Sequence, residues 1–201
     1  IDFDAVRNSI LSQNTEIYVS EAGKILESLG DKDKGTINIK GLVWKVAQED
    51  ELSSDSVKSA VEAGAEYIVA ETKGLDTVDK LVAAVDNNIE LIRKCGLCLL
   101  VENSNLYNGK HYIYGPFSEG KKLCDIVEGL RKRVHYDNIG ICADIGVANL
   151  LGSNLKAFTR DCMKYLVLIH MNDNDGVTDM AQMPFTFTVG RGTRATDIFR
   201  V

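Results

Sequence analysis

Apolar runs of strand length alternate along the chain with longer segments whose apolar positions recur at helical spacing. The strand-like runs lie at 36–46, 66–70, 97–101, 139–143 and 166–169. The helical pattern occupies 16–29, 54–63, 77–94, 120–134 and 155–164. Several of the strand-like runs are almost wholly apolar, as strands covered on both faces are. The alternation therefore predicts a parallel sheet covered by helices.

The number of β/α units favours a barrel. We count about five units, with no break in composition between them. A closed (β/α)8 barrel takes about 250 residues, more than the 201 present. We therefore predict an α/β fold, a TIM-type barrel with terminal strands missing from this sequence, and one domain over 1–201. An open doubly wound sheet is the alternative, but no G-x-G-x-x-G follows an early strand to support its dinucleotide-binding form.

Composition narrows the functional classes. The chain is 45% hydrophobic and 26% charged, which is ordinary for a soluble globular protein. Its net charge of -6 argues against a nucleic-acid partner, which needs a basic face. No apolar run approaches the roughly 20 residues that span a bilayer, and no signal-like segment opens the chain. We therefore expect no membrane partner and a cytoplasmic location.

Cysteine usage supports the same compartment. The five cysteines are scattered and odd in number, as reduced thiols in the cytosol are. Cys95 and Cys98 have the spacing of a redox or zinc motif, but no second such pair accompanies them. They fall where a helix ends and a buried strand begins, so we favour a structural role for both.

Three predicted strands end in a side chain that can bind a metal. The run CLCLLVEN carries Glu102 at its end, NIGICAD ends at Asp144, and YLVLIHMNDNDGVTD carries His170 where its apolar part ends. Loops at the C-terminal ends of parallel barrel strands gather such groups onto one point. Two oxygens and one nitrogen suit Mn²⁺, Mg²⁺, Co²⁺ or Zn²⁺. The alternatives are a solvated strand end for each acid and a core position for His170.

The residues around these strand ends form four ordered motifs. They are Glu102-Asn103, Asp144-Ile-Gly-Val-Ala148, His170-Met-Asn-Asp173 and Gly190-Arg-Gly-Thr-Arg-Ala-Thr-Asp197. In order and spacing they resemble the xylose-isomerase-like TIM-barrel superfamily, which includes sugar epimerases and endonuclease-IV-type enzymes. The similarity runs from about Val57 to the end of the chain.

The resemblance implies that Glu102, Asp144 and His170 are ligands of one divalent metal ion, with Mn²⁺ favoured over Mg²⁺, Co²⁺ and Zn²⁺. The fourth ligand in the family is a glutamate on the eighth strand, which would follow Val201. Val147 stands where many members of the superfamily have a histidine, and Ala181 and Glu71 stand where the nucleases have histidines. A three-zinc nuclease site needs those nitrogens, so the resemblance favours the one-metal sugar isomerases and epimerases.

The chemistry expected of such a site is proton transfer next to a sugar carbonyl. A divalent ion stabilises an enediolate, and carboxylates move the proton. The resemblance implies that Glu102 is both ligand and catalytic acid/base. A metal-dependent sugar lyase and a catalytically degenerate barrel that serves as a binding or assembly subunit remain open.

Further residues are candidates for contact with the small-molecule sugar. An aromatic loop follows Glu102, and one interpretation is that its rings form a wall for the sugar. The alternative interpretations are a packed surface loop and a subunit contact, so homo-oligomerisation stays open. The polar residues expected to bind substrate are Glu71, Lys40, Trp44, His111, Asp173, Asp179 and Arg191.

Overall fold

The computed structural model describes residues 42–45, 52–62, 65–184, 186–187 and 196. The helix predicted at 16–29 and the candidate residues Lys40 and Arg191 lie outside these residues. Of Trp44 only the backbone is described. The described elements all belong to one compact unit, residues 41–201. The single domain over 1–201 therefore stays a prediction.

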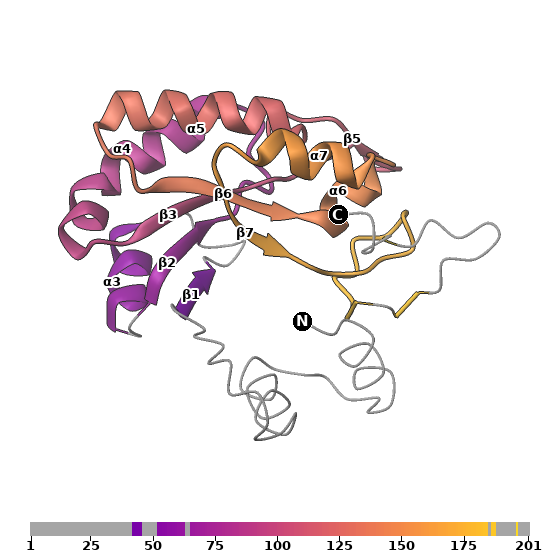
Figure 1. Ribbon diagram of the computed structural model, residues 1–201, viewed down its shortest axis with the longest axis horizontal. Helices are drawn as coiled ribbons and strands as arrows, with labels where there is room; N and C mark the ends of the chain where they lie inside the picture. Colours follow the sequence, from indigo (N-terminus) through magenta and orange to yellow (C-terminus); the bar gives the residue numbers. More distant parts are fainter. Residues whose placement is uncertain (1–41, 46–51, 63–64, 185, 188–195, 197–201) are drawn as a thin grey trace, which may run out of the picture. The chain divides into compact units, whose positions relative to one another are not determined.

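A five-stranded parallel sheet organises the described residues, in the order β1-β2-β3-β6-β7 (Figure 1). Its strands are β1 Leu42–Lys45, β2 Ala65–Ala70, β3 Cys98–Glu102, β6 Ile139–Asp144 and β7 Leu166–His170. The helices are α3 Ser54–Glu62, α4 Val78–Cys95, α5 Gly120–Val134, α6 Ile145–Leu150 and α7 Leu155–Cys162. A separate antiparallel hairpin joins β4 Leu106–Tyr107 to β5 Tyr112–Ile113.

The two faces of the sheet are buried in different ways. Successive side chains of a strand point to opposite faces. Leu99, Val101 and Ile141 belong to the main core, together with apolar side chains of α3, α4, α5 and α7. Figure 1 shows α4, α5 and α7 on the same side of the sheet. Leu100 and Cys142 form a second cluster with Val69 and Cys98 on the other face, which we call the inner face. Burial on both faces explains the apolar strands.

Local signals set most of the helix ends. Gly96 ends α4 in the left-handed conformation, with φ of 70°, and its N–H donates to Arg93 O and Ile92 O. Glycine adopts this conformation without a Cβ clash, so it is well suited to end the helix. Asn154 begins α7 by accepting a hydrogen bond from the Ala157 N–H.

One helix was not predicted from the sequence. Residues 145–150, directly after Asp144, form helix α6. The side chain of Asp144 accepts a hydrogen bond from the Val147 N–H and so caps this helix. A six-residue helix is too short to leave a periodic pattern in the sequence.

None of the helices in the described part of the chain has both the length and the apolar character that a membrane crossing requires.

Candidate functional site

Strand register brings the predicted strand-end residues to one edge of the inner face. Glu102 of β3 is paired with Cys142 of β6, and Asp144 of β6 is paired with His170 of β7. Paired residues of neighbouring parallel strands point to the same face, and so do residues two apart in one strand. These four side chains therefore share the inner face at the C-terminal ends of three adjacent strands.

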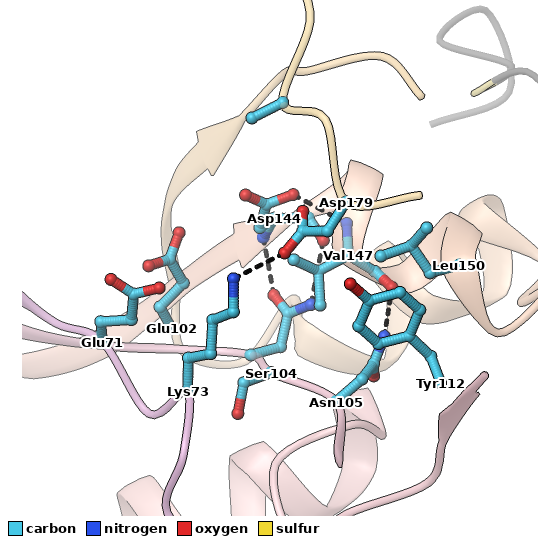
Figure 2. A pocket seen from close by; sticks show the side chains of 12 residues that line it. Glu71, Lys73, Glu102, Ser104, Asn105, Tyr112, Asp144, Val147, Leu150 and Asp179 are labelled. Atoms are coloured by element: carbon cyan, nitrogen blue, oxygen red, sulfur yellow. Dashed lines mark hydrogen bonds and ion pairs between the residues drawn. The ribbon is translucent and has the colours of Figure 1, made fainter. Parts of the chain in front are cut away.

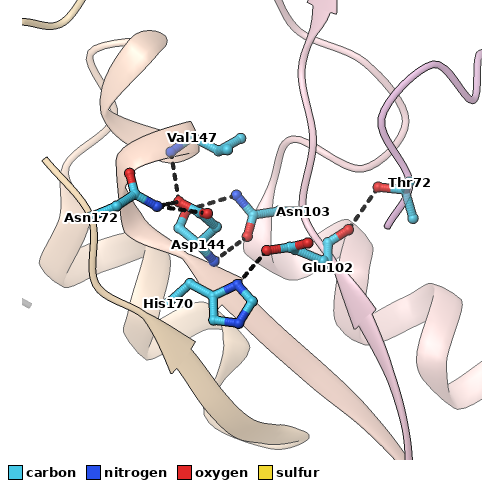
Figure 3. A network of polar contacts seen from close by, with 7 residues as sticks. All are labelled: Thr72, Glu102, Asn103, Asp144, Val147, His170 and Asn172. Atoms are coloured by element: carbon cyan, nitrogen blue, oxygen red, sulfur yellow. Dashed lines mark hydrogen bonds and ion pairs between the residues drawn. The ribbon is translucent and has the colours of Figure 1, made fainter. Parts of the chain in front are cut away.

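Glu102 and His170 are in direct contact. Glu102 Oε1 lies 2.5 Å from His170 Nδ1, and the exposed fractions of the two side chains are 3% and 26% (Figure 3). An ionised carboxylate only accepts hydrogen bonds, so His170 Nδ1 would be the donor to an ionised Glu102. The main chain of Glu102 is held as well, because Thr72 Oγ1 donates to Glu102 O at 2.7 Å.

Asp144 is held in a separate network. Its Oδ1 accepts from the Val147 N–H at 2.9 Å, and Asn172 Nδ2 lies 2.8 Å from both carboxylate oxygens (Figure 3). Asp144 is 6% exposed. Burial raises the pKa of its carboxyl group above the usual value and the charge of Glu102 adds to the rise, although the bonds from Val147 and Asn172 and the charge of His170 oppose it.

The described residues place a cysteine beside Glu102 and His170. Ligand atoms of Glu102, Cys142 and His170 all lie within 4.8 Å of one another. Asp144 is not part of this group. The structure thus brings two of the three predicted ligands into contact, while the Asp144 carboxylate faces Asn172 and Val147.

A cavity of about 180 Å³ opens beside these residues. The residues that line it lie at the C-terminal ends of strands or in the segments that follow β2, β3, β6 and β7. They are Glu71, Lys73, Glu102, Asn103, Ser104, Asn105, Tyr112, Asp144, Val147, Leu150, Asp179 and Ala181. Figure 2 shows the ammonium of Lys73 pointing to Asp179, with which it forms a 2.8 Å ion pair. Burial alone would lower the pKa of Lys73, but Asp179 and the charge of Glu71 outweigh it and raise the pKa. Lys73 therefore keeps its positive charge, and Asp179 holds its ammonium group in place.

The residues that were predicted to bind substrate lie in different parts of the structure. Glu71 and Asp179 line the cavity. His111 lies exposed in the turn of the β4–β5 hairpin, where its ring contacts Asn108 at 3.2 Å. Asp173 is fully buried and accepts from the main-chain N–H groups of Asn174, Phe187 and Thr196, so it orders the segment after β7.

The aromatic loop divides in a similar way. Tyr112 lines the cavity, and burial is the main reason that its pKa is raised. Phe117 is fully buried in the main core, whereas Tyr107 and Tyr114 are exposed. Of these four aromatic side chains, only that of Tyr112 lines the cavity.

Sequence reasoning missed two residues of the site. Cys142 lies two positions before Asp144, so the period of a strand was the signal for its shared face. Its place in the apolar run IGICA instead marked it as core. The contact of Asn172 with Asp144, which lies 28 residues away in sequence, left no local signal.

The five described parallel strands and their outer helices correspond to part of a TIM-type barrel. This confirms the predicted fold class and the resemblance at the level of the fold. The chain is similar to a D-tagatose 3-epimerase-like protein, with a TM-score of 0.54 and 20% identity over 70% of this chain and 59% of that chain. It is also similar to an L-ribulose 3-epimerase, with a TM-score of 0.50 and 13% identity over 80% of this chain and 57% of that chain.

A weaker similarity is to endonuclease IV from Thermus thermophilus, with a TM-score of 0.48 and 18% identity over 81% of this chain and 62% of that chain. The chain thus spans between 57% and 62% of the length of these three structures. No protein-family model matches the chain, and no curated protein matches its sequence.

Proposed function

We propose that this protein is a divalent-metal-dependent sugar isomerase or epimerase of the cytoplasm. The observation that carries the proposal is the part-buried contact between Glu102 and His170 beside a polar cavity at the C-terminal strand ends. A carboxylate that is 3% exposed is costly to desolvate unless cationic or donor groups receive it. The epimerases to which the fold is similar support the same reaction class.

Glu102, His170 and Asp144 would hold the ion, which supplies Lewis-acid stabilisation of an enediolate when bound. Mn²⁺ is favoured by the sequence resemblance, with Mg²⁺, Co²⁺ and Zn²⁺ as alternatives. Glu102 would take the proton from the carbon next to the sugar carbonyl and return it. Its main chain is fixed by Thr72, which limits the movement of this strand end.

The charge of the cavity points to a neutral sugar. The described lining carries four carboxylates, those of Glu71, Glu102, Asp144 and Asp179, and one ammonium, that of Lys73, which Asp179 already pairs. With a divalent ion bound, four negative charges still face three positive ones, which disfavours a phosphate or a sugar acid. Hydroxyl groups would instead donate hydrogen bonds to Glu71 and Asp179. We therefore propose an unphosphorylated aldose or ketose as substrate.

One observation favours a second candidate function. Asn172 and the Val147 N–H occupy both oxygens of Asp144. An Asp144 carboxylate that is held by these bonds fits a degenerate barrel that binds its ligand and acts as a binding or assembly subunit, either alone or as a homo-oligomer.

Proton exchange separates the two functions. The protein is incubated in D₂O with Mn²⁺ and a panel of neutral ketoses and aldoses, and deuterium at carbon is followed by NMR. We expect exchange by the wild type and a loss of about 10²–10⁴-fold in Glu102→Gln, the range for a catalytic acid/base. Glu62→Gln, on the surface of α3, is the control. Metal binding without exchange of any sugar would contradict the enzyme and support the binding protein.

A further inference from the structure

Cys142 lies in the floor of the candidate metal site. It is 0% exposed, sits on the inner face of β6, and is directly opposite Glu102 in the β3–β6 register. The resemblance to the sugar isomerases implies carboxylate and histidine ligands and gives this position no role. We propose that Cys142 supplies a thiolate ligand, so that the site is a thiolate–carboxylate–imidazole site selective for Zn²⁺. This rests on the metal dependence proposed above.

The first argument is geometric. One ligand atom from each of Glu102, Cys142 and His170 lies within 4.8 Å of the other two. Zinc binds sulfur at about 2.3 Å and nitrogen or oxygen at about 2.0–2.2 Å, so its ligand atoms lie roughly 3–4 Å apart. The three side chains reach that spacing by small rotations, because they already come from three adjacent strands with fixed register.

The second argument concerns Asp144, which the sequence placed in the ligand set. Its carboxylate accepts bonds from Asn172 and the Val147 N–H, and the latter bond caps α6. Using Oδ1 as a ligand would remove this cap and uncover the first turn of α6, and using Oδ2 would compete with the bond from Asn172. Cys142 offers a third donor atom that already lies in the compact group, and its use leaves both bonds intact.

The third argument is chemical selectivity. Thiolate and imidazole donors suit Zn²⁺ and Co²⁺, whereas Mn²⁺ and Mg²⁺ prefer carboxylate, carbonyl and water oxygens. The set of one sulfur, one nitrogen and one oxygen therefore shifts the expected ion from Mn²⁺ to Zn²⁺. On binding, the Sγ–H bond of Cys142 breaks, the sulfur–metal bond forms and the proton passes to solvent, with no change of oxidation state.

The chain offers a matched control in Cys98. This cysteine lies on β3 in the same inner-face cluster and is 8% exposed, but it is not part of the group around Glu102. Burial raises the pKa of the Cys98 thiol to about 11, which keeps it protonated at neutral pH. A cysteine of similar burial therefore differs from Cys142 chiefly in its distance from the other ligands.

The test replaces Zn²⁺ by Co²⁺ and records the near-ultraviolet thiolate-to-cobalt charge-transfer band. We expect the band in the wild type and in Cys98→Ser, and its loss in Cys142→Ser. Zinc affinity of Cys142→Ser should fall by at least the roughly 10–100-fold that changes in outer-shell partners cause. X-ray absorption of the zinc-loaded wild type should show a sulfur shell at about 2.3 Å, a readout that needs no variant to fold.

The outcomes separate this inference from the proposed function. Bound Co²⁺ without the band, or a band that survives in Cys142→Ser, overturns the thiolate ligand and leaves the proposed enzyme standing. Absence of any bound metal in the wild type overturns both. Deuterium exchange that depends on metal but is equal in Cys142→Ser and wild type, with no sulfur shell, also overturns the thiolate ligand alone.

Discussion

The side-chain amide of Asn103 forms a two-bond ring with the main chain of Asp144. Asn103 Nδ2 donates to Asp144 O at 2.9 Å, and the Asp144 N–H donates to Asn103 Oδ1 at 2.6 Å. A side chain thereby continues the β3–β6 ladder by one step beyond the last residue of β3. Both residues are buried, so this ring fixes the strand end from which Asp144 projects.

Removing this ring should destabilise the protein. We expect Asn103→Ala to lower the free energy of unfolding by about 1–3 kcal/mol, because a buried N–H and a buried C=O of Asp144 lose their partner. Urea unfolding followed by circular dichroism measures the change. Asn108→Ala, which removes an acceptor of similar bonds in the exposed hairpin turn, should cost much less. Equal losses in the two variants would contradict the role of burial.

Gly146 leaves the space that Asn172 occupies. A Cβ at position 146 would overlap Asn172 Oδ1, so Gly146→Ala must displace the Asn172 side chain. We expect a loss of about 1–3 kcal/mol in the free energy of unfolding, typical of overpacking. In α5, a Cβ at Gly129 meets nothing within 4 Å. Gly129→Ala should therefore stabilise the protein by about 0.5–1 kcal/mol.

A double variant tests whether the clash is specific. If Asn172 is the residue that the added methyl group displaces, Gly146→Ala should cost less in an Asn172→Ala background than in the wild type. Thermal or urea unfolding of the four proteins gives the coupling free energy. Strict additivity would show that the methyl group disturbs something other than Asn172.

The buried carboxyl group of Asp144 should make stability fall with rising pH. Its pKa is raised above the ordinary 3.8 by burial first and by the charge of Glu102 second. The folded state therefore holds this proton more tightly than the unfolded state, and the contribution of the group to stability declines as the pH rises from 3.8 through the folded pKa. In metal-free protein, Asp144→Asn should become less destabilising over that rise. Unfolding curves of the two proteins that stay parallel across the window would contradict this.

Glu128 should show the opposite slope. Hydrogen bonds and ion pairs with Lys132 and then Lys164 lower its pKa from 4.5 to about 2. The stability that it contributes is present above pH 4.5 and is lost as the pH falls through about 2. Glu128→Gln should thus be less stable than the wild type at neutral pH and equal to it near the acid limit. Because the pairs are at the surface, salt should shrink the difference. A difference that persists at high salt would point to packing instead.

The sequence predicted the long elements well because their patterns are strong. The helix predicted at 120–134 is α5, and the strand predicted at 139–143 is β6 without its last residue. The hairpin of two-residue strands was not predicted, since so short a pairing has no period. β1 is described only at Leu42–Lys45, near the end of the predicted run.

The candidate site was predictable only in part. Strand ends gave Glu102, Asp144 and His170, because parallel strands deliver their ends to one edge. The partner of each carboxylate depends on side-chain direction and on register across 28 to 68 residues, as the Asp144–Asn172 and Glu102–His170 contacts show. Register between β6 and β7 also shifts between Ile141 and Cys142, a local irregularity that no residue pattern announces.

The ion pair between Lys73 and Asp179 has a consequence for the order in which parts of the protein fold. It joins residues 106 positions apart, across the mouth of the cavity. Contacts of such long sequence separation close large loops and are slow to form during folding. We therefore expect the parallel strands between them to pair before this contact forms, so that the rim of the cavity is set late. Occupation of the cavity would then select chains that have completed β7, and a ligand added during refolding would report the last step of folding.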